Sequence, residues 1–231
     1  VESVDVLVRH GIKRLKVASS EITHYPLLSA AGETGLPVIL STGMSNLGRI
    51  EKALKTIGHD NVVLLHCTAA YPVPDTEVNL RVFQTLQHAF GLPVGFSDHT
   101  EGTLAAGIAI VFGAVMIEKH FTLDKNLPGP DHAFSVTPHE LGELTGTVRR
   151  TEQMLGSSRK VITEKESGTM EYTPGLFAFC DIAEGSDIKA NNIEVRRRNK
   201  EGIGAELLDI VKERKARVFI PKGAPITWDK I

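Results

Sequence analysis

The first 156 residues alternate between short apolar runs and longer amphipathic stretches. Helical periodicity fills the intervals, as in "NLGRIEKALKTIG" and "EGTLAAGIAIVFG", and glycine or proline marks the joins. The apolar runs are continuous, which indicates strands buried on both faces. Strand followed by helix, repeated, predicts a parallel sheet with right-handed crossovers. The predicted strands lie at 14–19, 37–42, 61–68, 93–98 and 114–120.

The pattern changes after Gly156, where a last long amphipathic stretch ends. Residues 157–171 are polar and predict a linker. Residues 172–231 contain the short β-like pieces "LFAFCDI", "IEVRR", "ARVFIPKG" and "APITW", which predict a small, mostly β second domain. The first domain, 1–156, has only five predicted strands. That number suits an open doubly wound sheet, whereas an eight-stranded barrel would need three more.

Composition narrows the function classes. The chain has 231 residues, 42% hydrophobic and 23% charged, as is usual for a soluble globular protein. The formal net charge of -2 announces no nucleic-acid partner, and no run approaches the roughly 18 apolar residues of a membrane span. Two cysteines make no disulfide framework and favour a cytoplasmic location. The chain opens without Met inside a predicted helix, so we expect further sequence upstream.

Polar residues stand at the carboxyl end of every predicted strand. In parallel α/β folds the chemistry lies at this end of the sheet. One polar strand end would mean little, because strand ends meet water, but five in a row predict a site. The residues are Lys16, Ser19, Ser20 and Glu21; Ser41, Thr42 and Gly43; His66, Cys67, Thr68 and Tyr71; Ser97, Asp98, His99 and Thr100; and Glu118, Lys119 and His120.

Two histidines end neighbouring predicted strands. Neutral imidazole binds borderline divalent cations, and His99 and His120 would leave coordination positions for water or substrate. Glu118 lies two residues before His120, on the same face of an ideal strand, and is placed to join or orient the ligands. The alternative is that each histidine only hydrogen-bonds a neighbouring loop. The two together with Glu118 favour a metal site.

Other polar residues allow two interpretations each. Lys16 lies in an apolar strand, where an ammonium needs an anion. One interpretation is that a phosphate or carboxylate group of a substrate supplies the anion, with serine hydroxyls as further donors. The other is that Glu21 or another interior carboxylate pairs with Lys16. Asp131, in the Pro/Gly-rich loop 127–135, either reaches over the site or satisfies its own loop. Cys67 neighbours His66 but points to the opposite face, so we expect a core cysteine.

Several phrases, taken in order, resemble the sialic acid synthase family, which includes legionaminic and pseudaminic acid synthases and related spore-coat synthases. These phrases are "RLKVASSEITHYPLL", "PVILSTGM", "LLHCTAAYPVP", "GFSDHT", "IEKHFTLDKNLPGPDHAFS" and "DIAEGSDI…IEVRRRNKEGI". They extend over essentially the whole chain. The resemblance implies a (β/α)8 barrel followed by a small antifreeze-like (SAF-type) domain. Full members begin with three more strands, so the predicted strands would be the fourth to eighth of a partial TIM barrel.

The resemblance also implies a reaction and its residues. The family condenses phosphoenolpyruvate with an N-acetylated aldose, such as N-acetylmannosamine, to a nine-carbon 2-keto acid and phosphate. A divalent ion, Mn or Mg, polarises the aldehyde. His99 and His120 match the metal ligands, and with Glu118, the acidic residue beside the metal, they form the expected catalytic set. Positions that hold phosphoenolpyruvate are matched by Lys16, Ser19, Ser41 and Ser97, and those that contact the sugar by Glu21, Tyr71 and Asp131.

A partner chain completes the site in the family. In its domain-swapped homodimers the small domain of one chain caps the barrel of the other and offers an arginine to the N-acetyl sugar. The "EGI" frame matches this role to Arg198, with Arg197 as the fallback. Here Asn199 and Lys200 follow, where the family usually has Pro-Gly, and Ala69 stands where it often has Asn or Ser.

The family's catalytic Glu after the first strand and its phosphate-binding Lys on the second have no counterpart in this chain. We therefore expect the polypeptide to be incomplete and inactive alone, since an open sector of a barrel leaves strand edges unpaired. Two other functions remain open. A metal-dependent hydrolase would use the two histidines to activate water. A non-enzymatic sugar-binding module would use residues 172–231.

Overall fold

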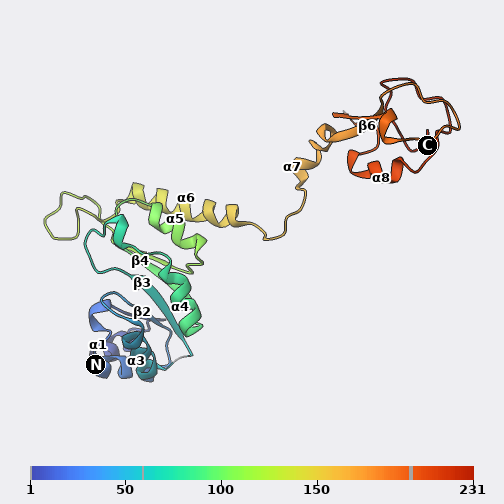
Figure 1. The fold of residues 1–231 in the computed structure, drawn as a ribbon. Helices are drawn as coiled ribbons and strands as arrows, with labels where there is room; N and C mark the ends of the chain where they lie inside the picture. Colours follow the sequence, from blue (N-terminus) through green and yellow to red (C-terminus); the bar gives the residue numbers. More distant parts are fainter. Residues whose placement is uncertain (1, 59, 198–199) are drawn as a thin grey trace. The chain divides into compact units, whose positions relative to one another are not determined.

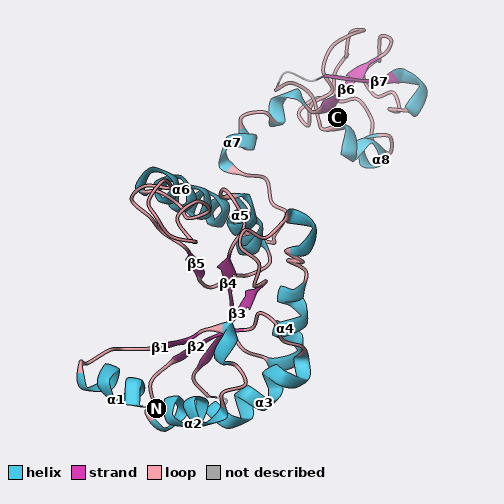
Figure 2. Cartoon of the chain, turned by 90° about the vertical axis from the view of Figure 1, so that its left-hand side faces the viewer, coloured by secondary structure: helices cyan, strands magenta, loops and turns pink. Residues whose placement is uncertain are grey.

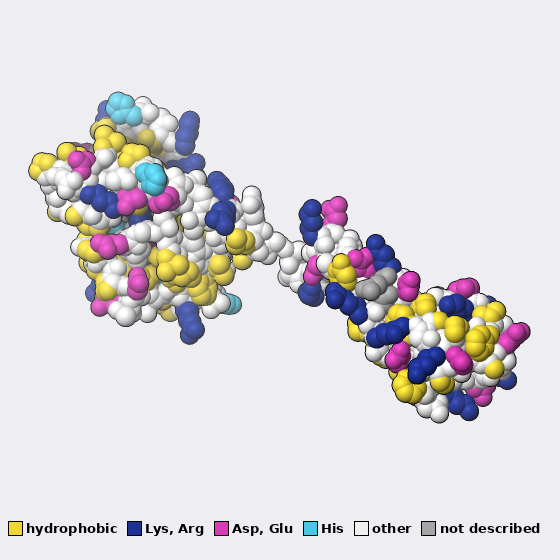
Figure 3. Space-filling view, turned by 90° about the horizontal axis from the view of Figure 1, so that it is seen from above, with side chains coloured by type: hydrophobic (Ala, Val, Ile, Leu, Met, Phe, Trp, Pro, Cys, Tyr) yellow, Lys and Arg dark blue, Asp and Glu magenta, His cyan; other side chains and the backbone are white. Residues whose placement is uncertain are grey.

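A computed structural model describes residues 2–58, 60–197 and 200–231 (Figure 1). The chain divides into two compact units, residues 1–156 and 157–231. Figure 3 shows acidic, basic and hydrophobic side chains mixed over the face of each unit that it presents. Among the helices of the described residues, none combines the length and apolar character that a membrane crossing requires.

The first unit is built on a five-stranded parallel sheet whose strands lie side by side in chain order. The sheet curls as part of a barrel would (Figure 2). This confirms the prediction of a parallel α/β fold and is consistent with a partial TIM barrel. The strands are β1 (Leu15–Val17), β2 (Val38–Ser41), β3 (Val62–Cys67), β4 (Val94–Asp98) and β5 (Ile117–Lys119).

Helices connect successive strands and follow the outer side of the curl (Figure 2). Their ends carry the expected signals: Asn46 accepts a hydrogen bond from the Arg49 N–H at the start of α3, and Gly58 ends that helix with a φ of 94°. The α-helices are α1 (Glu2–Arg9), α2 (Tyr25–Glu33), α3 (Leu47–Ile57), α4 (Val82–Phe90), α5 (Leu104–Val111) and α6 (Pro138–Leu155), and the 3-10 turns are η1 (Ser19–Glu21) and η2 (Asp75–Glu77).

The core of this unit lies between the sheet and the helices. Leu40, Leu64 and Val94 from three adjacent strands are fully buried there. Side chains of successive strand residues point to opposite faces of a sheet. The residues that precede and follow these three along their own strands therefore point to the concave side. Phe83 of α4 packs against the rings of His66 and Phe96 at centroid distances of 5.6 and 6.0 Å. The concave face is therefore left to polar groups near the strand ends.

A capping box begins α6. Thr137 Oγ1 accepts a hydrogen bond from the Glu140 N–H, while Glu140 Oε2 accepts from the Thr137 N–H and hydroxyl. Lys125 Nζ lies 2.6 Å from Glu140 Oε1. The hydrogen bond from Lys125 and that from the Thr137 N–H hold the pKa of Glu140 at about 2. The carboxylate therefore stabilises the fold only while it is ionised.

We expect Glu140→Gln to lower the free energy of unfolding by about 1 kcal/mol at neutral pH. The folded-state pKa lies below the ordinary value of 4.5, so the stabilisation is present above pH 4.5 and is lost as the pH falls toward about 2. Urea unfolding of both proteins, repeated at decreasing pH, should show the difference shrinking below pH 4.5. Glu143→Gln, on the same helix, serves as the control. A difference that persists unchanged in acid would contradict this role.

The second unit is small and only partly β. Strands β6 (Pro174–Ala178) and β7 (Ile193–Arg197) pair antiparallel over a core of Leu176, Ile188 and Ile220. The other predicted β pieces, "ARVFIPKG" and "APITW", form isolated bridges rather than strands, because single residues such as Ile220 and Pro225 pair where the chain turns. The remaining elements are α7 (Glu164–Ser167), η3 (Met170–Tyr172), η4 (Ala190–Asn192), η5 (Ala205–Leu207) and α8 (Leu208–Val211).

Candidate active site at the carboxyl ends of the strands

Strand register brings polar residues together at the carboxyl end of the sheet. Cys67 of β3 is paired with Ser97 of β4, and Ser97 with Glu118 of β5, so the three side chains lie in one row on the concave face. The next pair, Asp98 and Lys119, points to the helix side. The two residues that follow this pair along the chain are the two predicted metal ligands.

His99 and His120 lie next to each other, with ring centroids 5.3 Å apart and ring planes at 76°. The Nδ1–H of His99 donates to the Thr68 carbonyl at 3.0 Å, and the Nδ1 of His120 lies 3.6 Å from Asp131 Oδ2. Within the described part of the chain, neither Nε2 has a hydrogen-bond partner. Partners at Nδ1 favour the tautomer that presents Nε2 as a lone-pair donor, as in known metal sites.

The separation of the two ring centroids is compatible with a shared divalent ion. With each coordinating nitrogen about 2.1 Å from the ion, ring centroids would lie about 4.5–5.3 Å apart for ligand angles between square and tetrahedral. The observed 5.3 Å lies at the upper end of that range. The described residues contain no group of three or more His, Cys, Asp or Glu side chains placed to hold a metal ion. A cation here would have two protein ligands, His99 and His120, and positions open to substrate and water.

The surroundings shift the pKa values of His99 and His120 in opposite directions. Burial lowers the pKa of His99, but the contact with Cys67 and the hydrogen bond to the Thr68 carbonyl outweigh it, so the pKa is raised. For His120, burial and the neighbouring charge of His99 together lower the pKa, against the opposing pull of Asp131. The two imidazoles therefore differ in basicity although their rings are neighbours.

Tyr71 covers the two histidines. Its ring centroid lies 4.3 Å from that of His99 and 5.7 Å from that of His120, and Phe134 packs against both Tyr71 and His120. Burial, and then the negative charges of Cys67 and Asp131, raise the pKa of Tyr71. The phenol therefore stays protonated and is a hydrogen-bond donor at the mouth.

A second polar cluster lies beside the histidines on the concave face. Lys16 Nζ is 3.4 Å from Glu118 Oε2, and the Ser97 hydroxyl donates to Glu118 Oε1 at 2.7 Å. The anion that Lys16 meets is therefore an interior carboxylate, and it is not Glu21. The side chains of Lys16 and Glu118 are 33% and 41% exposed, so both remain accessible to a ligand.

Two further serines lie at the carboxyl end of β2 and just beyond that of β1. Ser41 is 2% exposed, and its hydroxyl has no hydrogen-bond partner among the described residues. Such buried, unsatisfied groups are rare and suggest a ligand. Ser19 Oγ accepts from the Gly43 N–H at 2.9 Å. A Cβ at residue 43 would lie 2.8 Å from Ser19 Oγ and 3.2 Å from Cys67 Sγ, so glycine permits the close approach of these groups.

Cys67 is buried, 7% exposed, as expected of a core cysteine, and it also lies beside the site. Its Sγ lies 3.9 Å from His99 Nδ1. Burial raises the pKa of the thiol, but hydrogen bonds from His99 and Ser19 outweigh it and the pKa is lowered. The available signal was the two-residue period of a strand, which places Cys67 on the concave face once its pairing with Ser97 is known. His66 points the other way, and its Nε2–H donates to the Val78 carbonyl at 2.7 Å.

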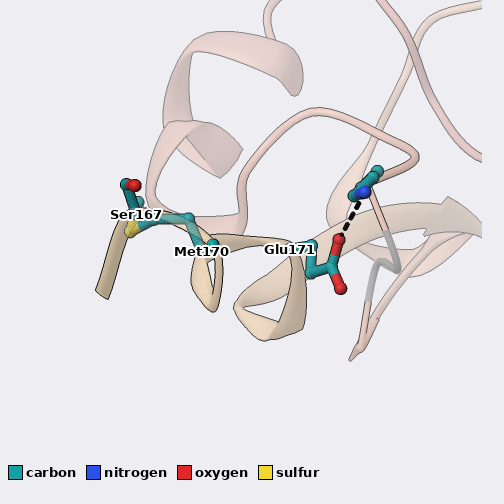
Figure 4. Close-up of a pocket in the computed structure, with 5 residues that line it drawn as sticks. Ser167, Met170 and Glu171 are labelled. Atoms are coloured by element: carbon teal, nitrogen blue, oxygen red, sulfur yellow. Dashed lines mark ion pairs between the residues drawn. The ribbon is translucent and has the colours of Figure 1, made fainter. Parts of the chain in front are cut away.

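Among the described residues, one predicted sugar-binding residue, Glu21, is not brought into this cluster. Within that part of the chain, the Glu21 carboxylate accepts a hydrogen bond only from the Ser20 hydroxyl, at 3.4 Å. Arg198 lies outside the described residues, and its neighbour Arg197 stacks on the Tyr172 ring at 4.2 Å within the second unit. A shallow pocket of that unit is formed around Ser167, Met170 and Glu171, where Lys200 pairs with Glu171 at 2.8 Å (Figure 4). None of the predicted site residues that the structure describes lines this pocket.

Comparisons with known proteins identify the first unit. The model of the NeuB family matches residues 1–160. The N,N'-diacetyllegionaminic acid synthase of Legionella pneumophila is 37% identical over 100% of this chain and 67% of its own length. The chain spans about two thirds of the curated relatives it matches, from 61% to 68% for the first three.

Solved structures agree with the fold. A crystal structure of N-acetylneuraminic acid (sialic acid) synthetase from Leptospira borgpetersenii, in complex with citrate, is 36% identical with a TM-score of 0.69, over 74% of this chain and 61% of that one. A putative spore coat polysaccharide biosynthesis protein E from Chromobacterium violaceum is 26% identical with a TM-score of 0.80, over 99% of this chain and 70% of that one.

Proposed function

The chain belongs to the NeuB family, and from this premise we propose that it carries the metal-binding and substrate-binding part of a sugar acid synthase. The proposed reaction condenses phosphoenolpyruvate with an N-acetylated aldose, such as N-acetylmannosamine, to a nine-carbon 2-keto acid with release of phosphate. One observation carries the proposal. The ring centroids of His99 and His120 lie 5.3 Å apart beside the cluster of Lys16 and Glu118, and neither Nε2 atom has a hydrogen-bond partner among the described residues.

His99 and His120 would hold the cation through their Nε2 atoms, while Thr68 and Asp131 contact the Nδ1 atoms and would orient the rings. A divalent ion, Mn²⁺ or Mg²⁺, supplies Lewis-acid polarisation of the aldehyde. Tyr71 and Asp131 flank this position and contact the sugar, and Glu21 joins them once the ligand is bound. Glu118, which is 3.4 Å from Lys16 and two residues before His120, would move a proton at the reacting carbons.

The phosphoenolpyruvate anion occupies the concave face beside this position. Lys16 supplies an ammonium, and Ser41, Ser19 and Ser97 supply hydroxyl donors to phosphate or carboxylate oxygens. The unpartnered Ser41 hydroxyl supports this assignment, because a phosphate oxygen would satisfy it. When the anion binds, Lys16 exchanges its partial pairing with Glu118 for the phosphate.

The second unit is proposed to act as an SAF-type cap on a partner chain. In a domain-swapped homodimer its arginine, Arg198, would reach the N-acetyl group of the sugar in the other barrel.

Cys67 and Cys180 are both free thiols, which fits the proposed location in a reducing cytoplasm.

The function is tested in a completed-barrel fusion, in which three strand–helix units of a curated relative precede residue 1. We expect release of phosphate from phosphoenolpyruvate that depends on both Mn²⁺ and N-acetylmannosamine. Phosphate release without any aldose would contradict the proposal and favour a metal-dependent hydrolase. Sugar binding by residues 157–231 that needs no metal, combined with an inactive fusion, would favour a binding module instead.

We propose further that the 231-residue chain by itself does not turn over. Its sheet is open, because β1 and β5 each pair with a single neighbour in the described residues. The five strands enclose the concave face on one side only. Water therefore reaches the site, although the reaction needs water to be excluded. The assay above, applied to the chain alone, should give no phosphate release. Robust turnover would refute the inactivity and leave the synthase assignment standing.

Lys16→Met should weaken phosphoenolpyruvate binding to the completed-barrel fusion by about 10–100-fold, because hydrogen bonds to charged groups contribute about 1.5–3 kcal/mol. Isothermal titration with phosphoenolpyruvate measures the change. Lys55→Met is the matched control, since Lys55 is also paired with a glutamate, Glu51 at 2.7 Å, but lies on the exposed side of α3. Equal affinities for the two variants would remove Lys16 from the binding site.

A further inference from the structure

A buried ion pair lies on the helix side of the sheet, opposite the proposed metal position. Lys119 Nζ is 2.9 Å from Asp98 Oδ2, and the two side chains are 4% and 0% exposed. The proposed reaction uses neither residue, because both point away from the concave face. Burying two charges is costly, and an apolar pair of similar volume often stabilises a fold as well or better. The pair therefore needs a reason other than stability.

Asp98 fixes the chain on both sides of His99. Its Oδ1 accepts from the Thr100 N–H at 2.9 Å and from the Thr100 hydroxyl at 2.7 Å. Lys119 Nζ donates to the Thr100 carbonyl as well as to Asp98. The residues before and after His99 are thus tied to one another and to the strand that carries His120.

Lys119 fixes the other histidine through the backbone. It immediately precedes His120 and is the register partner of Asp98, so the ion pair crosses between the two strands one residue before each imidazole. The carbonyl of His99 accepts from the Val73 N–H at 3.0 Å, and that of His120 from the Val136 N–H at 2.9 Å. Each histidine is therefore held by its own loop. Asp98–Lys119 links the two strand ends on the helix side, as the Ser97–Glu118 hydrogen bond does on the concave side.

We propose that Asp98 and Lys119 are positioning residues that set the separation of His99 and His120 for a shared cation. This inference rests on the proposed function, since it assigns a purpose to the spacing of the two rings. A directional, charged contact holds one strand-end geometry, whereas apolar side chains would allow several. Groups behind the ligands of metal sites act in this way, and their loss weakens metal affinity about 10–100-fold.

The test uses the full 231-residue chain carrying Asp98→Asn together with Lys119→Met. This double variant leaves no uncompensated buried charge, and the substituted amide can still accept from Thr100. It removes the Asp98–Lys119 link together with the hydrogen bond from Lys119 to the Thr100 carbonyl. Co²⁺ is the probe, because imidazole binds it more tightly than Mn²⁺ or Mg²⁺. Calorimetry measures Co²⁺ affinity, and nuclear Overhauser cross-peaks between the His99 and His120 rings report their proximity without metal.

We expect a Co²⁺ affinity at least about tenfold weaker, with the ring–ring cross-peak lost and the urea unfolding midpoint retained. The matched control replaces another ion pair of the same unit, Lys125→Met with Glu140→Gln, and should leave the Co²⁺ affinity and the cross-peak unchanged. Lys119→Arg, which keeps the charge with a wider head group, should weaken affinity severalfold and decides the matter if the double variant does not fold.

Unchanged cross-peaks and unchanged affinity in the variants overturn the inference and leave the proposed function intact. If the wild-type chain binds no Co²⁺, the metal assignment of the proposed function fails. The cross-peak alone then decides the positioning role, supporting it if lost in the variants and overturning it if retained.

Discussion

Replacing His99 or His120 with alanine is expected to lower phosphate release by the completed-barrel fusion about a thousandfold. Polarisation of a carbonyl by a bound cation stabilises the transition state by several kcal/mol, and about 4 kcal/mol corresponds to that factor. In the proposed site His99 and His120 are the two protein ligands, so removing either would leave a single one. Affinity for Co²⁺, measured on the chain alone, should fall in parallel.

The control for this experiment is His139→Ala. His139 is an exposed imidazole on α6, and it lies near Glu143 rather than another histidine. Both turnover and Co²⁺ affinity should remain those of the parent protein. If His99→Ala and His120→Ala retained turnover within about tenfold, the histidines would be loop-binding residues and the cation would not act at this position.

Phe83→Ala should lower the free energy of unfolding of the first unit by about 3–5 kcal/mol. The Phe83 side chain is fully buried and makes edge contacts with the His66 and Phe96 rings, which belong to β3 and β4. Its removal leaves a cavity beneath the two strands that end at Cys67 and Asp98. Urea unfolding followed by far-ultraviolet circular dichroism measures the loss.

The matched control is Phe121→Ala, because Phe121 is 52% exposed and should change stability by no more than about 0.5 kcal/mol. The removal of Phe83 should also leave His66 less enclosed. Burial lowers the pKa of that imidazole, so its pKa should move back toward 6.5 in a folded variant, as followed by nuclear magnetic resonance. A loss of stability below about 1 kcal/mol would mean that α4 is not anchored through this ring.

Local sequence determined much of the first unit. Each of the five largely apolar runs contains one of the observed strands, because strands of a parallel sheet covered on both faces are mostly apolar. The same reasoning placed His99 and His120 just beyond the ends of β4 and β5, and family-specific phrases such as "SDHT" and "EKHFT" led to the NeuB family. In the second unit the reasoning was weaker, since isolated bridges of one residue leave no periodic pattern.

Only the tertiary structure decided which polar residues meet. Glu118 as the partner of Lys16, Cys67 beside His99, and the link between Asp98 and Lys119 all depend on the register between strands far apart in the chain. The two-residue period of a single strand says which face a side chain takes, but not which residue stands beside it on the next strand. The register between strands is set by how the helices pack against the sheet, and a local sequence pattern carries no information about that packing.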